Sequence, residues 1–154
     1  MSKIFTIAIL VVVLCSISCK AENNNGILVE DKTPIINSED ILTESIGIET
    51  LGGVFTPIIP VGHKLPVGVS KIFSTAVENQ DQIMVKLYRG NAQLIKDTTA
   101  LGNYQITGIR PAPRGEPQIE ITFKVENNSI KLFAKDLGIG KELKIIKQNS
   151  PTKQ

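Results

Sequence analysis

Three residues of this 154-residue chain carry side chains that often perform chemistry: Cys15, Cys19 and His63. Both thiols lie within the first twenty residues, and the body of the chain has no cysteine, so no disulfide framework can hold the folded part together. One histidine without a thiol in the same region cannot assemble the ligand cluster of a typical zinc site or a Cys–His catalytic pair. We therefore expect no catalytic residues, no metal ligands and no cofactor, and the protein is predicted not to be an enzyme.

The first residues have the pattern of an export signal. Lys3 precedes an apolar run from Ile4 to Cys15. Such a run fits the roughly 7–15 apolar residues of a signal peptide and is shorter than the roughly 20 that span a bilayer. We expect residues 1–18 to be a signal peptide, and the protein to be exported to the cell envelope.

Cys19 is the residue best placed for covalent modification. It ends the segment Ser16-Ile17-Ser18-Cys19, which resembles the bacterial lipobox, where a cysteine receives a diacylglycerol and becomes the new N-terminus. Cys19 is therefore predicted to be a lipid anchor that holds the protein on a membrane. Ser16 stands where the lipobox usually has leucine, so secretion as a soluble protein, after cleavage at Ser18 or Ala21, stays open as the alternative.

The next segment, Lys20 to Glu44, is mostly polar and contains Asn23-Asn24-Asn25-Gly26 with several acidic residues. Its apolar patches, Ile27 to Val29 and Ile35-Ile36, are short. Segments of low hydrophobicity cannot bury enough apolar surface to fold alone. We expect residues 19–44 to form the lipid anchor and a flexible tether.

From residue 45 to residue 148 the pattern changes to short runs rich in Val, Ile and Thr, closed by Gly, Pro and Asn. This pattern predicts an all-β fold, an antiparallel two-sheet β-sandwich of about eight strands, with residues 149–154 as a tail. The expected strands are Ile46 to Glu49, Val54 to Ile59, Gly68 to Ala76, Gln82 to Tyr88, Gly102 to Ile109, Gln118 to Val125, Ile130 to Ala134 and Lys141 to Ile146.

The segment Ile119 to Val125 alternates strictly between apolar and polar residues. This alternation predicts a strand that buries Ile119, Ile121, Phe123 and Val125 on one face. Asn127-Asn128 follows it, and because asparagine tolerates positive φ, this pair predicts a tight turn into the next strand.

Four blocks in this region are more specific. They are Ser45 to Val54, Phe73 to Ala76 with Asn79-Gln80, Gly108 to Gly115 and Pro117 to Phe123. In order and spacing they resemble the peptide-binding β-sandwich of the seventy-kilodalton heat-shock chaperones, and the resemblance extends from about Ser45 to Lys147. It implies a domain that binds extended apolar segments of unfolded proteins between two loops, Thr50 to Gly53 and Ala76 to Asp81.

The resemblance also implies a set of peptide-binding residues in this chain. The apolar pocket falls on Ile48, Phe73, Ile83, Val85 and Ile119, the residues that arch over the bound backbone are Leu51 and Ala76, and the main-chain hydrogen bonds involve Thr50, Ser74 and Gln80. Taken alone, each of these apolar residues fits the core of a plain sandwich better than a pocket. The two matched loops favour the binding site.

One feature suggests that binding does not depend on ATP. The stretch Ile36 to Thr43 stands where the family has an apolar linker to its ATPase, and three of its four linker positions are polar. We expect neither an ATPase nor a helical lid, and no nucleotide partner. The predicted function is that of a membrane-tethered holdase. The alternative is an envelope lipoprotein that uses the sandwich as a structural or specific protein-interaction domain.

Nucleic acid is not expected as a partner. The formal charge is only +2, from 17 basic and 15 acidic residues that are scattered along the chain. Binding to a phosphate backbone normally requires basic residues gathered on one stripe or face.

Overall fold

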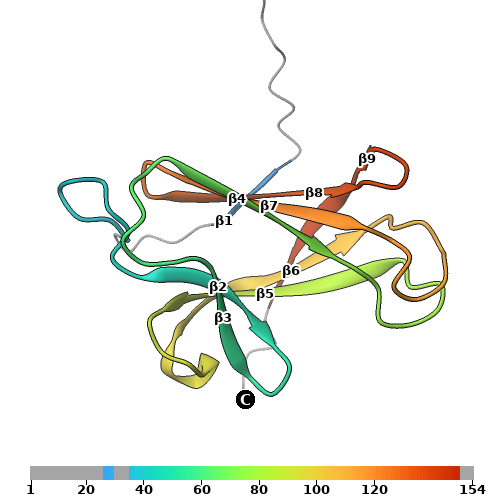
Figure 1. Cartoon of the computed structure of the whole chain (residues 1–154), viewed down its shortest axis with the longest axis horizontal. Coiled ribbons are helices and arrows are strands. Elements are labelled where there is room, and N and C mark those ends of the chain that lie inside the picture. Colours follow the sequence, from blue (N-terminus) through green and yellow to red (C-terminus); the bar gives the residue numbers. More distant parts are fainter. Residues whose placement is uncertain (1–25, 30–34, 150–154) are drawn as a thin grey trace, which may run out of the picture.

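The computed structural model describes residues 26–29 and 35–149, which form two antiparallel sheets packed face to face (Figure 1). This arrangement confirms the predicted all-β sandwich. The described residues contain no α-helix, and their one helical element is a 3-10 turn, η1 (Ile95–Asp97). The first sheet has the order β1 (Ile27–Val29), β8 (Ser129–Asp136), β7 (Ile119–Glu126) and β4 (Val67–Phe73), with β9 (Lys141–Glu142) also paired to β8. The second has the order β10 (Lys144–Gln148), β6 (Thr99–Thr107), β5 (Gln82–Gly90), β2 (Ser45–Thr50) and β3 (Val54–Ile59).

Strand β7 supplies the centre of the core. Its residues alternate between fully buried and partly exposed, and the four predicted apolar residues, Ile119, Ile121, Phe123 and Val125, are all fully buried. Burying each of them stabilises the fold by about 1.5–3 kcal/mol. The second sheet contributes the fully buried Tyr104, whose hydroxyl donates a hydrogen bond to the carbonyl of Leu101 at 3.2 Å. The ring therefore adds apolar contacts without leaving a buried polar group unpaired.

The turn from β7 to β8 is the predicted one. Asn127 and Asn128 have φ values of 47° and 60°, and Glu126 pairs directly with Ser129. A two-residue turn with positive φ at both positions matches the natural twist of two paired strands. It also sets the register, so that Ile119 lies opposite Asp136 at the far end of the hairpin.

The predicted strand Lys141 to Ile146 is divided into two. β9 pairs with β8 in the first sheet, and β10 pairs with β6 in the second. Between them Leu143 is buried, and its N–H donates to the carbonyl of Ala134 at 2.9 Å. The chain thus crosses from one sheet to the other at Leu143, a change that the alternation of residues does not reveal.

The prediction of a flexible tether is wrong for the part of residues 19–44 that the structure describes. β1 extends the first sheet by pairing with Ile130 to Leu132 of β8. Ile35 and Leu42 are buried in the core, and the N–H of Ile35 donates to Oδ1 of Asn128 at 2.8 Å. A few apolar side chains are sufficient here because the sandwich supplies the surface that they cover.

Some predictions fall outside the described residues. These are the signal peptide at 1–18, the anchor Cys19, the tether residues 20–25 and 30–34, and the tail from residue 150 onward. In the described part of the chain, no helix has the length and apolar character needed to cross a bilayer.

Four loops gather at one end of the sandwich. The antiparallel registers place the loops 51–53, 74–81, 108–118 and 137–140 at this end, and Figure 1 shows the last three together on the right. Two of these loops belong to the predicted binding site. The sandwich therefore brings together segments that are far apart in the sequence.

Leu42 tests whether the segment before the predicted domain belongs to its core. Leu42→Ala should lower the free energy of unfolding by about 2–5 kcal/mol, because it leaves a cavity in a packed interior. Leu51→Ala is the matched control, since Leu51 is 98% exposed and the same change should cost less than about 0.5 kcal/mol. Chemical denaturation of the full chain measures both, and equal stabilities of the two variants would contradict the observed packing.

Candidate functional site

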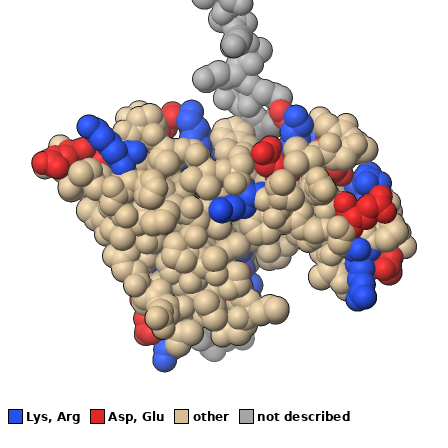
Figure 2. Space-filling view, in the orientation of Figure 1, with Lys and Arg blue, Asp and Glu red and all other residues tan. Residues whose placement is uncertain are grey.

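A groove with a volume of about 580 Å³ opens at the loop end of the sandwich. Ligand sites usually have volumes of roughly 300–1,000 Å³, so this groove is large enough to be one. Figure 2 shows the hollow at the lower right of the molecule, between the β2–β3 turn and the loops on the right. The groove is lined by Ile48, Glu49, Thr50, Leu51, Phe73, Ser74, Ala76, Gln80, Ile83, Met84, Val85 and Lys86.

Nine of the ten predicted peptide-binding residues line this groove. Three strand ends and two loops bring them together, because β2 and β5 are paired while β4 lies in the opposite sheet. The predicted arch residues Leu51 and Ala76 are both exposed, one on each loop. The grouping agrees with a binding site, and binding of peptide by these residues stays a prediction.

Ile119 is the exception. It is fully buried in β7, directly opposite Phe73 of β4, and it is not among the groove's lining residues. Because the two side chains share one face of the sheet, Ile119 lies beside Phe73 in the core. It belongs to the core cluster against which the partly buried Phe73 packs.

The sequence interpretation missed three lining residues, Glu49, Met84 and Lys86. Each follows a predicted site residue by one position, so it lies on the opposite face of its strand. A groove that runs across the end of a sheet can reach both faces. The position of these residues at strand ends, next to the matched loop, was the signal available in the sequence.

Gln80 holds the 74–81 loop in shape. Its Oε1 accepts hydrogen bonds from the N–H groups of Ala76 at 2.9 Å and Val77 at 3.2 Å, and its Nε2 donates to the carbonyl of Gln82 at 2.7 Å. One amide side chain thereby joins three points of the same wall. The predicted role of this side chain in contacting a ligand stays a prediction, and the bonds seen here give it a structural role inside the wall.

The other two polar site residues are also engaged within the protein. The hydroxyl of Ser74 donates to the carbonyl of Pro117 at 2.6 Å. On the opposite wall, the Thr50 hydroxyl is 2.9 Å from that of Thr56 and donates to the carbonyl of Val54 at 3.3 Å. Both walls are therefore braced by side-chain hydrogen bonds.

The outer rim of the groove carries one ion pair. The ammonium of Lys86 is 2.9 Å from Oε2 of Glu49, and the Tyr88 hydroxyl donates to the same oxygen at 3.5 Å. The hydrogen bond with Glu49 and the charge of Glu49 raise the pKa of Lys86 above its usual value. Burial, aided by Glu49, raises the pKa of Tyr88. Near neutral pH the rim thus combines a paired positive and negative charge with a neutral phenol.

The 108–118 loop supports the wall formed by the 74–81 loop. The N–H of Asn79 donates to the carbonyl of Ala112 at 2.9 Å, and the N–H of Gly115 donates to the carbonyl of Thr75 at 3.0 Å. A third bond joins the N–H of Ile109 to the carbonyl of Asp81 at 3.1 Å. Together with the Ser74 hydroxyl, these bonds make one wall of the groove depend on the neighbouring loop.

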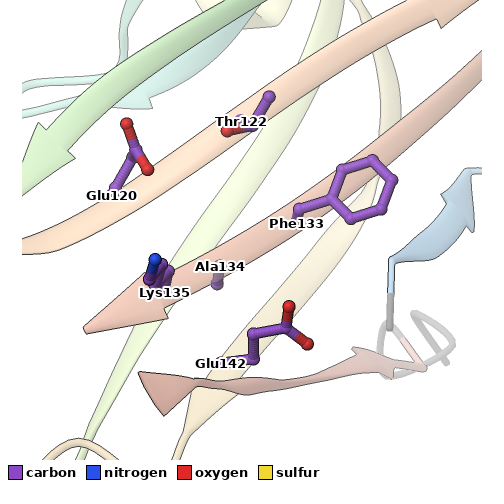
Figure 3. Close-up of a pocket in the computed structure, with 6 residues that line it drawn as sticks. All are labelled: Glu120, Thr122, Phe133, Ala134, Lys135 and Glu142. Carbon is purple, nitrogen blue, oxygen red and sulfur yellow. The ribbon is translucent and has the colours of Figure 1, made fainter. Parts of the chain in front are cut away.

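A second hollow lies on the first sheet (Figure 3) and is lined by Glu120, Thr122, Phe133, Ala134, Lys135 and Glu142. Its volume is about 140 Å³, below the range of ordinary ligand sites. The strand registers place Glu120, Lys135 and Glu142 in one row across β7, β8 and β9. Such a row of alternating charges is typical of a solvent-facing sheet surface.

Comparison with known proteins identifies a family and two relatives of this chain. The family model described as Hsp70 protein matches residues 13–154. The chain is 49% identical over 104 residues to the chaperone protein DnaK of Methanothermobacter thermautotrophicus, a match that covers 67% of this chain and 17% of that protein. It is 46% identical over 112 residues to the chaperone protein DnaK of Mycoplasmoides gallisepticum, which covers 72% and 19%. The matches therefore span about a fifth or less of these relatives.

Gln80 provides a test of the braced wall. Gln80→Ala removes the acceptor for two N–H groups, so amide hydrogen exchange at Ala76 and Val77 should become roughly 5- to 30-fold faster. Gln80→Glu keeps an acceptor oxygen for the two N–H groups but loses the donor to the Gln82 carbonyl, so it should raise both rates less than Gln80→Ala does. Exchange rates measured by NMR decide the matter, and unchanged rates in Gln80→Ala would show that the bonds do not hold the loop.

Proposed function

Because the chain belongs to the Hsp70 protein family, we propose that it binds extended apolar segments of unfolded polypeptides in the groove between the loops 51–53 and 74–81. The observation that carries this proposal is the meeting of nine predicted residues around one groove of suitable size. Binding of this kind needs no nucleotide, and the protein would act as a holdase that keeps apolar segments from aggregating.

The chemistry of the groove suits an aliphatic side chain. Ile48, Phe73, Ile83 and Val85 are apolar residues from three different strands, and all of them line the groove. Burying a leucine or isoleucine side chain of a ligand against them contributes about 1.5–3 kcal/mol. Because ordering a flexible peptide opposes binding, the net affinity should be modest.

The backbone of a bound peptide would be held by main-chain groups of the walls. This assignment follows because the Gln80 oxygen and the hydroxyls of Ser74 and Thr50 already have partners within the protein. Main-chain contacts to an extended peptide are independent of its sequence. The site should therefore tolerate many sequences, provided that each supplies an apolar side chain for the pocket.

The described part of the chain leaves the groove open to solvent on one side. Leu51, at the tip of one wall, is 98% exposed. Such a site can release peptide without first moving a cover, and weak binding of this kind arises mainly from rapid dissociation. A holdase that works without an energy source benefits from rapid release, because clients must leave in order to fold.

Ile83 offers a direct test of the groove. Ile83→Phe places a larger side chain in the pocket and should weaken binding of a fluorescent leucine-rich peptide by roughly 10- to 100-fold, which corresponds to losing the burial of one aliphatic side chain. Fluorescence anisotropy with the full chain measures the affinity. Ile146→Phe is the control, since Ile146 lies in β10 away from the groove lining and is exposed. Equal affinities of the two variants would exclude the groove as the peptide site.

We also propose that the protein is exported and attached to a membrane through Cys19. The support is in the sequence alone: Lys3, the apolar run that follows it, and the small residues before Cys19. Metabolic labelling of the full chain with an alkyne fatty acid in a bacterial host should mark the protein, and Cys19→Ser should abolish the label while Cys15→Ser retains it. Labelling that survives Cys19→Ser would remove Cys19 as the anchor.

A further inference from the structure

Two charged side chains next to the loop that supports the groove, Asp136 and Arg110, each have a buried polar atom without a partner among the described residues. The Arg110 side chain as a whole is partly exposed. Asp136 is fully buried. Its Oδ1 accepts a hydrogen bond from the N–H of Gly138 at 2.9 Å, but its Oδ2 has no partner among the described residues. Arg110 shows a similar imbalance, since its Nη2 pairs with Glu116 at 3.1 Å while its buried Nε has no partner in the same part of the chain. A buried charged atom without a partner strongly favours any arrangement that supplies one.

The two unpaired atoms belong to side chains that meet at Gly138. A Cβ atom on Gly138 would lie 3.3 Å from Nη2 of Arg110, 3.4 Å from its Nε and 3.3 Å from Oδ1 of Asp136. The guanidinium and the carboxylate therefore face the same small space, which the absence of a side chain at residue 138 leaves available. A guanidinium can bind a carboxylate through two parallel hydrogen bonds, the strongest neutralising contact that a protein can offer an aspartate.

Both residues are connected to the groove through the backbone. Arg110 directly follows Ile109, whose N–H binds the carbonyl of Asp81 at the end of the 74–81 wall. Asp136 directly precedes Leu137, whose N–H donates to the carbonyl of Gln118 at 2.9 Å. A contact between the two side chains would thus join the 137–140 turn to the 108–118 loop, and that loop is bonded to the groove wall at Thr75, Asn79 and Asp81.

We propose that Arg110 is a positioning residue whose guanidinium exchanges between Glu116 and Asp136, and that the Asp136-bound arrangement fixes the 108–118 loop and with it the 74–81 wall. The Asp136 partner satisfies two buried atoms at once, whereas Glu116 is an exposed partner in an ion pair screened by water. The proposal rests on the proposed function only where it concerns peptide release; the contact itself is independent of any ligand.

The test uses the full chain with Arg110→Gln, Asp136→Asn and the double variant. Asp136→Asn keeps an oxygen for the Gly138 N–H and should fold. Amide exchange at Asn79 and Gly115 should rise about tenfold in each single variant, and the dissociation rate of a leucine-rich peptide should rise by a similar factor. The double variant should show no larger change than either single variant, because both remove the same contact. Changes that simply multiply in the double variant would overturn the pairing.

Three further variants separate this contact from general effects of charge. Glu116→Gln removes the competing partner and should give exchange and dissociation at or below the original rates, whereas a rise equal to that of Arg110→Gln would show that Arg110 acts through Glu116 and overturn the proposal. Gly138→Ala keeps both charges but crowds the guanidinium, and should resemble Arg110→Gln. Arg114→Gln, an exposed arginine in the same loop, should change neither rate.

The two readouts keep the separate ideas distinguishable. If the original protein binds no peptide, the proposed function fails, but amide exchange at Asn79 and Gly115 still shows whether Arg110 and Asp136 hold the loop. If peptide binds and Arg110→Gln alters neither exchange nor dissociation, the groove is real and the positioning role of Arg110 is wrong.

Discussion

The complete burial of one face of β7 is the constraint on which the rest of the molecule depends. Four apolar side chains alternate along this strand, and all four are fully buried. Strand pairing extends this buried face to β4 and β8, because residues opposite each other lie on the same face of the sheet. Phe73, Ile119 and Asp136 consequently lie in one row across β4, β7 and β8, all on the inner face. At one end of this row, Phe73 is the last residue of β4 and lines the groove. At the other end, Asp136 is the last residue of β8, just before the 137–140 turn. The core and the groove therefore share one register.

The sequence predicts the parts of the fold that are determined locally. Alternation identified the buried face of β7, and Asn127-Asn128 identified its turn, because both depend on neighbouring residues alone. The crossing at Leu143 and the packing of Ile35 and Leu42 depend on surfaces supplied by distant strands, and no local pattern announces them. The same distinction applies to the site. The family resemblance located the groove residues, but the internal bonding of Gln80 depends on the conformation of its loop.

Three polar side chains of the groove form hydrogen bonds within its own walls. Gln80, Ser74 and Thr50 are each hydrogen-bonded to other groups of the protein. The walls therefore have less conformational freedom to lose when a ligand binds. Apolar side chains and, at the rim, the Glu49–Lys86 pair face the hollow. Such walls have a shape specified by internal hydrogen bonds, and the proposed binding would then depend on the size and hydrophobicity of the side chain that enters the groove.

The edge position of β1 has a mechanical consequence. β1 holds to β8 through only three residue pairs, at the margin of the first sheet, whereas the groove is built from β2, β4 and β5. A pull applied to the chain before Ile27 would load this short ladder before any strand that borders the groove. The pairing of β1 with β8 would therefore break first under tension, while the strands that border the groove stay paired.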